Sequence, residues 1–317
     1  MNEMSQINYI EEIKRIKKEK NAIILAHYYQ TGDIQDIADF IGDSLALSQK
    51  AASNNADIIL FAGVKFMAET AKILAPGKKV LLPDMMAGCS LADSCKAPEF
   101  KKFLEENPGR TVVTYVNTTA DIKAMSDIIC TSSNAAQIIN YLPPDEKIIF
   151  APDRNLGNYI QSKTGRDIIV WNGACHVHEE FSLEAILKLK KENPEAKIIV
   201  HPECEMPVRM VADFIGSTSA LLEFTKKDNG RSYIVGTEPG IIHQMKKENP
   251  GKNYIPAPPK DSTCGCNECS FMKLITIKKI YECLKNEQPE IFVDKNIMLK
   301  AQKPIKRMLE ISAELGL

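Results

Sequence analysis

The sequence lacks three features that would place it in a broad functional class. Its 317 residues contain no apolar run of about 18, the length that crosses a bilayer. The formal net charge is only −1, so the chain lacks the positive excess that attracts nucleic acid or an anionic membrane. No low-complexity or linker segment is present. With 44% hydrophobic and 26% charged residues, the chain has the composition of a globular protein, and we expect neither a membrane nor a nucleic-acid partner.

The N-terminal stretch MNEMSQINYIEEIKRIKKEK is charged and amphipathic, so we expect a helix there and not a secretory signal. Nine cysteines in a chain without such a signal indicate a reducing cytosol. In that compartment cysteines serve more often as ligands or catalytic groups than as halves of disulfides. The odd number of cysteines points the same way. We therefore expect a cytoplasmic protein in which some cysteines carry chemistry.

A strand-helix unit recurs three times along the chain. The three copies are IILAHYYQTGDIQDIADFIGDS (23–44), VVTYVNTTADIKAMSDIICTSS (112–133) and IIVHPECEMPVRMVADFIGSTS (198–219). His27, Tyr115 and His201 fall at equivalent strand ends, 88 and 86 residues apart, and such a period indicates repeated structure. Each unit has four short β-branched runs separated by helical patterns, which is typical of parallel strands covered on both faces. The sequence predicts an α/β fold of three αβα units with short parallel sheets, related by a pseudo-threefold axis.

Turn-like stretches mark the predicted limits of the units, NPGR at 107–110 and NPEAK at 193–197. We expect an N-terminal helix and the first unit in residues 1–108. The second unit would occupy 109–194, and the third unit with the C-terminal helices 195–317. Residues 270–317 have the pattern of two helices. Parallel strands carry their functional loops at their carboxyl ends, so three inward-facing units would share one active site at the central axis.

Three cysteines occupy matching places in the three units. Cys89, Cys175 and Cys269 each follow the fourth strand of a unit, 86 and 94 residues apart. Thiolates are the usual ligands of iron–sulfur clusters, and three of them would leave the fourth iron open to water or substrate. A lone cysteine is usually a small buried residue, but the matching placement favours ligands here. Four cysteines have no such counterparts and are expected to be buried: Cys95, Cys130, Cys204 and Cys283.

Cys264 and Cys266 precede Cys269 in a CxCxxC sequence. This spacing alone would also fit a local zinc site or redox motif. Zinc usually takes four ligands, and no nearby histidine completes the set. A reversible disulfide between two of these cysteines stays open as a second alternative.

Polar residues end the first two strands of every unit. The first strands end in three pairs, which are His27 with Tyr29, Tyr115 with Asn117, and His201 with Glu203. The second strands end in turns with hydroxyl groups at 43–44, 131–133 and 217–219, which are expected to supply helix N-caps. Residues 63–65 and 236–240 would extend the lining after the third strands. Around one cavity, such groups and helix N-termini suit a substrate rich in carboxylate or phosphate.

Together these motifs resemble the quinolinate synthase family. The matching segments are His27-Tyr28-Tyr29-Gln30, DFIGDS, PDMMAGCSLAD, WNGACHVHEEF, HPE at 201–203 and CSFM at 269–272, and they cover essentially the whole chain. The resemblance implies the triplicated αβα fold and one [4Fe–4S] cluster held by three cysteines. It implies condensation of iminoaspartate with dihydroxyacetone phosphate to quinolinate, phosphate and water, for NAD biosynthesis. The partner that supplies iminoaspartate would be an aspartate oxidase or dehydrogenase.

The resemblance also assigns residues. Cys89, Cys175 and Cys269 would ligate the cluster, and its open iron would act as a Lewis acid. Tyr29 and Glu203 are expected to form the main acid–base pair, with His201 in support. The residues expected around the substrates are His27, Ser44, Tyr115, Val116, Asn117, Ser132, His178, His201, Pro202, Glu203 and Thr218. For His178 an exposed loop position is the alternative, and Tyr28 is expected to pack on the face of the strand opposite Tyr29.

Two other classes of protein share some of these features. A radical enzyme resembling the diphthamide-synthesis proteins would have the same three units and three cysteines. It would need a pocket for S-adenosylmethionine and a docking surface for a protein, whereas HPE and the paired serines favour small anions. A non-enzymatic iron–sulfur sensor would need an output surface, commonly a basic one, and this sequence shows none.

Overall fold

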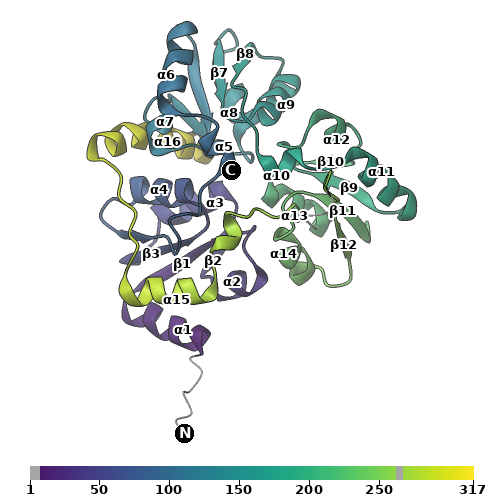
Figure 1. Cartoon of the computed structure of the whole chain (residues 1–317). Helices are drawn as coiled ribbons and strands as arrows, with labels where there is room; N and C mark the ends of the chain where they lie inside the picture. The colour runs from purple at the N-terminus through teal and green to yellow at the C-terminus, as the bar shows by residue number, and fades with distance from the viewer. Residues whose placement is uncertain (1–7, 262–266) are drawn as a thin grey trace.

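The structure, a computed structural model, describes residues 8–261 and 267–317. Within these residues the strands form three four-stranded parallel sheets around a common centre (Figure 1). Their orders are β2-β1-β3-β4, β6-β5-β7-β8 and β10-β9-β11-β12, so one connectivity occurs three times. The strands are β1 Ala22–His27, β2 Phe40–Gly42, β3 Ile58–Ala62, β4 Lys79–Leu81, β5 Thr111–Tyr115, β6 Ile128–Cys130, β7 Ile148–Ala151, β8 Ile168–Val170, β9 Lys197–Val200, β10 Phe214–Ile215, β11 Ser232–Gly236 and β12 Asn253–Pro256. The predicted α/β fold of three αβα units is confirmed.

Helices connect the strands and cover both faces of the sheets (Figure 1). The first unit contains α1 Tyr9–Glu19, α2 Gly32–Ile37, α3 Ser44–Ala52, α4 Lys65–Leu74, α5 Ser90–Asp93 and α6 Ala97–Glu106. The second contains α7 Ala120–Lys123, α8 Ala135–Tyr141, α9 Arg154–Thr164, α10 His176–Glu179 and α11 Leu183–Glu192. The third contains α12 Met206–Met210, α13 Thr218–Lys227, α14 Ile241–Glu248, the 3-10 turn η2 Met272–Leu274, α15 Ile277–Asn286 and α16 Lys295–Glu314. The unit limits at 108 and 194 stay a prediction.

An aspartate holds the second strand of each sheet beside the first. Asp39 accepts a 2.7 Å hydrogen bond from the backbone N–H of Ile24 through Oδ2. The same bond recurs between Asp127 and the backbone of residue 112 at 2.8 Å, and between Asp213 and the backbone of residue 198 at 2.7 Å. The separation is 15 residues each time. In each sheet the N–H belongs to the first strand and lies beside the start of the short second strand. The aspartate accepts the hydrogen bond that this N–H would otherwise lack.

The two C-terminal helices were predicted and are present. α15 packs against α1, where the rings of Tyr9 and Tyr281 lie 5.2 Å apart. α16 packs on α4 of the first unit and on α7, α8 and β6 of the second (Figure 1). Asn134 donates a 3.0 Å hydrogen bond to the Ser312 hydroxyl at the end of α16. α16 therefore fastens the first two units to each other.

The apolar core is distributed unevenly among the units. One continuous cluster includes Ile24 of β1, Val113 of β5 and Ile305 of α16, so the first two units share it. The third unit has separate clusters on the two faces of its own sheet. Tyr28 packs against one of these, as predicted. The other cluster contains Phe181 and Ile186, which precede β9 in the chain. Around the central cavity described below, the third unit also meets the others through polar contacts.

The predicted N-caps at the second strands are confirmed in one of three units. Ser217 caps α13 by accepting a hydrogen bond from the backbone of Ala220. The first unit uses Asp43 and not Ser44, and α8 has no side-chain cap from its preceding residue Asn134. The carboxylate of Asp43 is the better acceptor and occupies the cap position, so the hydroxyl next to it is left for other contacts. No helix within 8–261 and 267–317 is both long and apolar enough to cross a membrane.

Candidate active site

A cavity lies at the centre of the three units. The carboxyl ends of β1, β5 and β9 point toward it, because parallel strands with the same connectivity present the same end. Most of the residues predicted for the site line it. They are His27, Tyr29, Ser44, Cys89, Tyr115, Asn117, Ser132, Cys175, His178, His201, Glu203, Thr218 and Cys269.

Val116 and Pro202 do not line the cavity. Both were expected around the substrates, and both are buried beside residues that line the cavity. The backbone N–H of Val116 bonds to Cys130 at 2.8 Å, and the carbonyl of Pro202 accepts from Arg209 at 3.4 Å. These contacts stabilise the loops that carry Tyr115 and Glu203.

The three matching cysteines meet at the cavity from three different loops. Cys89 precedes α5, Cys175 precedes α10, and Cys269 precedes η2. Burial raises the pKa of Cys89 to about 12, with a smaller contribution from Cys269. Burial likewise raises the pKa of Cys175, with contributions from Glu203 and the other two thiols. The thiols are thus mutually close in a setting that disfavours free thiolates, and a bound cation would stabilise those thiolates.

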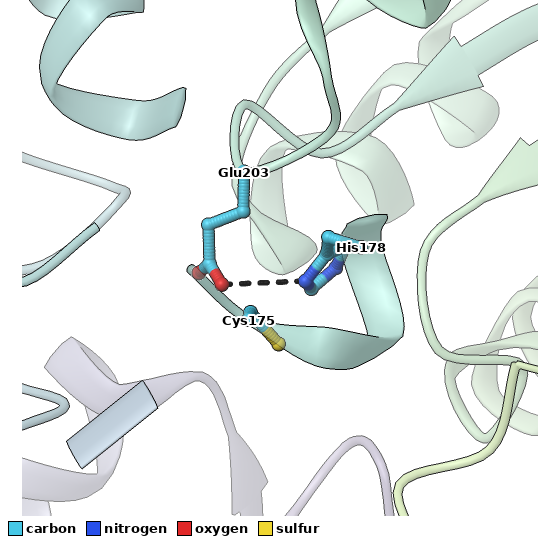
Figure 2. A group of neighbouring side chains, drawn as sticks. All are labelled: Cys175, His178 and Glu203. Carbon is cyan, nitrogen blue, oxygen red and sulfur yellow. Dashed lines mark ion pairs between the residues drawn. The ribbon is translucent and has the colours of Figure 1, made fainter. Parts of the chain in front are cut away.

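Cys175 also belongs to a tight group with His178 and Glu203 (Figure 2). One ligand atom from each lies within 4.8 Å of the others, so this group alone offers sulfur, nitrogen and oxygen to a metal. Nδ1 of His178 is 3.3 Å from Oε2 of Glu203, but the angles do not make a hydrogen bond, and both atoms lack a hydrogen-bond partner. Oε2 is therefore a buried acceptor that faces His178 and has no hydrogen-bond partner among the described residues (Figure 2).

Glu203 is the ionised acid of this group. Burial alone would raise its pKa, but His178, His201 and the hydroxyl of Tyr115 outweigh burial and lower the pKa to about 2. The Tyr115 hydroxyl donates to Oε1 at 2.6 Å. Burial and the Glu203 charge raise the pKa of Tyr115 well above its usual range, so this tyrosine stays protonated.

His27 and His201 are held in the same way at equivalent strand ends. Nδ1 of His27 accepts from the backbone N–H of Tyr29 at 3.2 Å, and Nδ1 of His201 accepts from that of Glu203 at 3.3 Å. Burial lowers the pKa of His27 to about 4 and that of His201 to about 3. Both rings are therefore neutral and carry their proton on Nε2. For His201 that nitrogen lies 3.1 Å from the Ser132 hydroxyl.

Tyr29 crosses from the first unit to the third. Its hydroxyl is 3.1 Å from the Thr218 hydroxyl and 2.8 Å from the Thr237 hydroxyl. Burial and the Glu203 charge raise the pKa of Tyr29 well above its usual range. Tyr29 is therefore a neutral proton donor whose orientation depends on the third unit.

Buried carboxylates hold two of the cysteine loops. Asp153 accepts from the backbone N–H of Cys175 at 3.2 Å, and Glu238 accepts from that of Cys269 at 3.4 Å. Asp153 also caps α9 through Leu156. Sequence reasoning missed Asp153. Its position after a third strand, equivalent to residues 63–65 and 236–240, was the signal available.

The residues that follow the cysteines also touch one another. The Ser90 hydroxyl is 2.7 Å from Nδ1 of His176, which links the first and second loops. The Phe271 ring lies 6.2 Å from the His176 ring, and a Cβ placed on Gly88 would lie 3.6 Å from Phe271. Thus each cysteine loop packs on the other two.

Several expectations about single residues are settled by burial. His178 is only 2% exposed, so the alternative of an exposed loop histidine is wrong. Cys95, Cys130, Cys204 and Cys283 are buried as predicted. Cys264 and Cys266 lie outside the described residues. Two apolar lining residues, Phe66 and Met67, were not foreseen, and nothing in their helical pattern separates a cavity wall from a core.

Comparisons with known proteins agree with this arrangement. A family model described as Quinolinate synthetase A protein matches residues 11–310. Quinolinate synthase of Thermosynechococcus vestitus is 56% identical over 306 residues, covering 96% of each chain. Those of Synechocystis sp. and Rippkaea orientalis are 59% and 61% identical over 300 residues, covering 95% of this chain and 94% and 92% of theirs. The chain therefore belongs to the quinolinate synthetase A family of enzymes.

Proposed function

We propose that the protein condenses iminoaspartate with dihydroxyacetone phosphate to give quinolinate, phosphate and water, in the de novo biosynthesis of NAD. The observation that carries the proposal is one central cavity where three thiols meet an ionised carboxylate and two neutral imidazoles. Membership of the family supports the same activity.

The thiols fit a [4Fe–4S] cluster with three cysteine ligands. Cys89, Cys175 and Cys269 reach the cavity from separate loops, and two of those loops are fixed by buried carboxylates. Among the residues that the structure describes, no fourth cysteine lines the cavity, and three soft ligands suit a cluster with one open iron. When bound, such a cluster supplies a Lewis acid for substrate oxygen or nitrogen.

The polar groups of the cavity suit anionic substrates. No lysine or arginine of the described residues lines it, so anions would be bound by hydroxyls, neutral imidazole N–H groups and helix ends. Ser44 and Thr218 are the first residues of α3 and α13, which places two helix N-termini at the cavity. Their partial positive charge favours carboxylate and phosphate.

The reaction needs several proton transfers, and the cavity contains groups that can donate protons and groups that can accept them. We assign Tyr29 as the main proton donor and Glu203 as the main acceptor, with His201 in support. Oε1 of Glu203 is taken by Tyr115, whereas Oε2 lacks a hydrogen-bond partner and faces the cavity wall formed by His178. A carboxylate with one free oxygen can accept a proton without breaking the contact that positions it.

Iminoaspartate would come from an aspartate oxidase or dehydrogenase, through transient contact or by diffusion. We also place the reaction in the cytosol, because three thiol ligands require a reducing compartment. The seven cysteines within the described residues are all free thiols.

The test is an anaerobic assay with reconstituted enzyme, iminoaspartate generated in place, and dihydroxyacetone phosphate. Quinolinate and phosphate should appear in equal amounts. Iron and sulfide analysis should give four of each per chain, and one Mössbauer signal should shift when substrate is added. Absence of quinolinate with an intact cluster would refute the proposal. Stoichiometric cleavage of S-adenosylmethionine by the reduced protein would instead support the diphthamide-type alternative.

A further inference from the structure

Three buried polar side chains occupy one position of the repeated unit. Gln35, Lys123 and Arg209 lie on α2, α7 and α12, the helices that follow the first strand of each unit. They are 88 and 86 residues apart, which is also the spacing of the matching strand ends. Their side chains are buried, with residue exposures of 1%, 0% and 9%. A buried polar group costs free energy unless it is bonded, so burial at all three places indicates specific contacts.

Gln35 joins the first unit to the third. Its Nε2 lies 2.9 Å from the Tyr28 carbonyl and 2.8 Å from the Gln30 carbonyl, on either side of the cavity residue Tyr29. The same nitrogen lies 2.9 Å from the carbonyl of Gly240, at the start of α14 in the third unit. A Cβ on Gly240 would come within 2.9 Å of the Tyr28 and Gln30 carbonyls, so a side chain at that position would clash.

Lys123 joins the second unit to the first. Its Nζ donates to the carbonyl of Thr118, next to the cavity residue Asn117. The same Nζ lies 5.4 Å from the centre of the Phe66 ring, in the first turn of α4 in the first unit. Phe66 also lines the cavity. One amine thus holds a backbone turn of the second unit against a cavity-lining ring of the first.

Arg209 joins the third unit to the second. Its Nη1 donates to the carbonyl of Pro202, next to Glu203, at 3.4 Å. It also donates to the Asn155 carbonyl at 2.9 Å, in the first turn of α9 in the second unit. The guanidinium lies 5.4 Å from the Tyr159 ring of the same helix. Arg209 therefore fixes the turn that carries the proposed proton acceptor against a helix of the neighbouring unit.

Together the three contacts close a ring around the centre of the molecule (Figure 1). In every case the donor follows the first strand of one unit, and its partner lies at the start of the helix after the third strand of a neighbour. Those helices are α14, α4 and α9. The first unit contacts the third, the third contacts the second, and the second contacts the first. Each cavity turn is therefore positioned by two units and not by its own unit alone.

We propose that Gln35, Lys123 and Arg209, which we call the inter-unit braces, are positioning residues of the reaction. They hold the turns after β1, β5 and β9 at fixed places relative to the neighbouring unit, and none of the three lines the cavity itself. The proposal rests on the proposed function for the identity of the reacting groups. Displacing a reacting group by about 1 Å can lower turnover about a hundredfold, so small shifts at the unit boundaries should alter catalysis.

The decisive comparison is Arg209→Met against Arg209→Gln in the cluster-loaded enzyme. Arg209 connects the Glu203 turn with α9, whose cap Asp153 also holds the backbone of Cys175. Methionine has a similar length but donates no hydrogen bond, whereas glutamine is the residue that the repeat itself carries at position 35. We expect kcat to fall about tenfold or more in the methionine variant, with KM changed less than about threefold. Glutamine should recover at least about threefold of that loss.

Unfolding measurements separate positioning from a loss of the fold. Replacing a buried charge by an apolar side chain is often neutral for stability, so urea unfolding of Arg209→Met should change little while kcat falls. Arg166→Met is the matched control, because Nη1 of Arg166 donates to the Ile139 and Leu142 carbonyls at 2.9 and 3.2 Å, all within the second unit. This control should keep kcat within about twofold.

The proposal is overturned if Arg209→Met keeps kcat as well as the control does, or if glutamine restores nothing. Should Arg209→Met fail to fold, Lys123→Met and Lys123→Gln are compared in the same way, with the same outcomes for and against. All folded variants should keep iron and sulfide, because no cysteine is changed.

Hydrogen exchange tests the braces without turnover. The backbone N–H of Cys204 bonds to the His201 carbonyl at 3.0 Å, within the turn that Arg209 holds. Its exchange should be about tenfold faster or more in Arg209→Met than in the wild type or in Arg166→Met. Unchanged exchange there would refute the brace. A wild-type enzyme that makes no quinolinate would refute the assigned reaction and leave the exchange result standing.

Discussion

The Tyr115 hydroxyl lies 2.6 Å from Oε1 of Glu203, although the two residues are 88 positions apart and belong to different units. This bond occupies one carboxylate oxygen and leaves Oε2 without a hydrogen-bond partner. Such a pair can exist only when the second and third units are assembled. The bond therefore places Glu203, the proposed proton acceptor, where the second and third units meet.

Glu203→Gln should keep the cluster and lose turnover. The amide has nearly the same shape but cannot take a proton, so kcat should fall by about 10²–10⁴. Glu205→Gln is the control, because Glu205 is two residues away and pairs with Lys260 at the surface. The measurements are anaerobic steady-state kinetics and iron analysis of both variants. Substantial activity in Glu203→Gln would show that Glu203 is not the base.

Cys269→Ala should lose the cluster and the activity together, because two thiolates do not hold the cubane. Cys283→Ala is the matched control from the same C-terminal stretch, since Cys283 is buried in the apolar core. Iron, sulfide and the visible absorbance are the measurements. An intact cluster in Cys269→Ala would show that another residue is the third ligand.

Acid should destabilise the fold through His27 and His201. Both are neutral when folded, with pKa lowered to about 4 and about 3, and protonate near pH 6.5 when unfolded. Between about pH 4 and 6.5 the unfolded chain binds more protons, so stability is present above that window and is lost as pH falls. Each group contributes roughly 1.4 kcal/mol per pH unit.

Urea unfolding of the cluster-free chain at several pH values tests this. His27→Gln should make the dependence of stability on pH shallower in this window. His243→Gln, a change at a half-exposed histidine outside the cavity, should leave the slope unchanged. A wild-type stability that is flat across this window would contradict the prediction.

Asp127→Ala should lower the free energy of unfolding by about 1 kcal/mol, because it removes the acceptor for the Val112 N–H and water replaces only part of that bond. Asp127→Asn keeps an acceptor oxygen and should lose less. Thermal or urea unfolding measures the difference. Equal losses in the two variants would mean that the aspartate acts through its charge and not through this hydrogen bond.

The sequence predicted the strands well because runs of β-branched residues are a local signal. The same pattern of runs also occurs in all three units, which supports each assignment. Matching cysteines and strand ends gave most of the cavity for the same reason. His178 was expected at the cavity with an exposed loop position as the alternative, and the sequence could not decide between the two because the outcome depends on how the loop after Cys175 folds against the third unit. Residues 236–240 were expected to extend the lining, but the contacts of Thr237 with Tyr29 and His178 cross 208 and 59 residues. No local pattern encodes such contacts.

Local hydrogen bonds of the aspartates and helix caps were also not predictable from the sequence. Asp39, Asp127 and Asp213 recur at a fixed distance before each second strand, yet their bonds to the first strand appear only in three dimensions. The choice of Asp43 over Ser44 as helix cap depended on one residue of register. Such a shift lies within the uncertainty of any helix end read from sequence.

The unequal division of the apolar core has a mechanical consequence. Separating the first two units would expose their shared apolar core to water, and this exposure costs free energy. Separating the third unit from the others would break polar contacts such as Ser132 with His201 and Gln35 with Gln244, whose groups water can then satisfy. Exposing these polar contacts to water is therefore less costly than exposing the apolar core that β1 and β5 share.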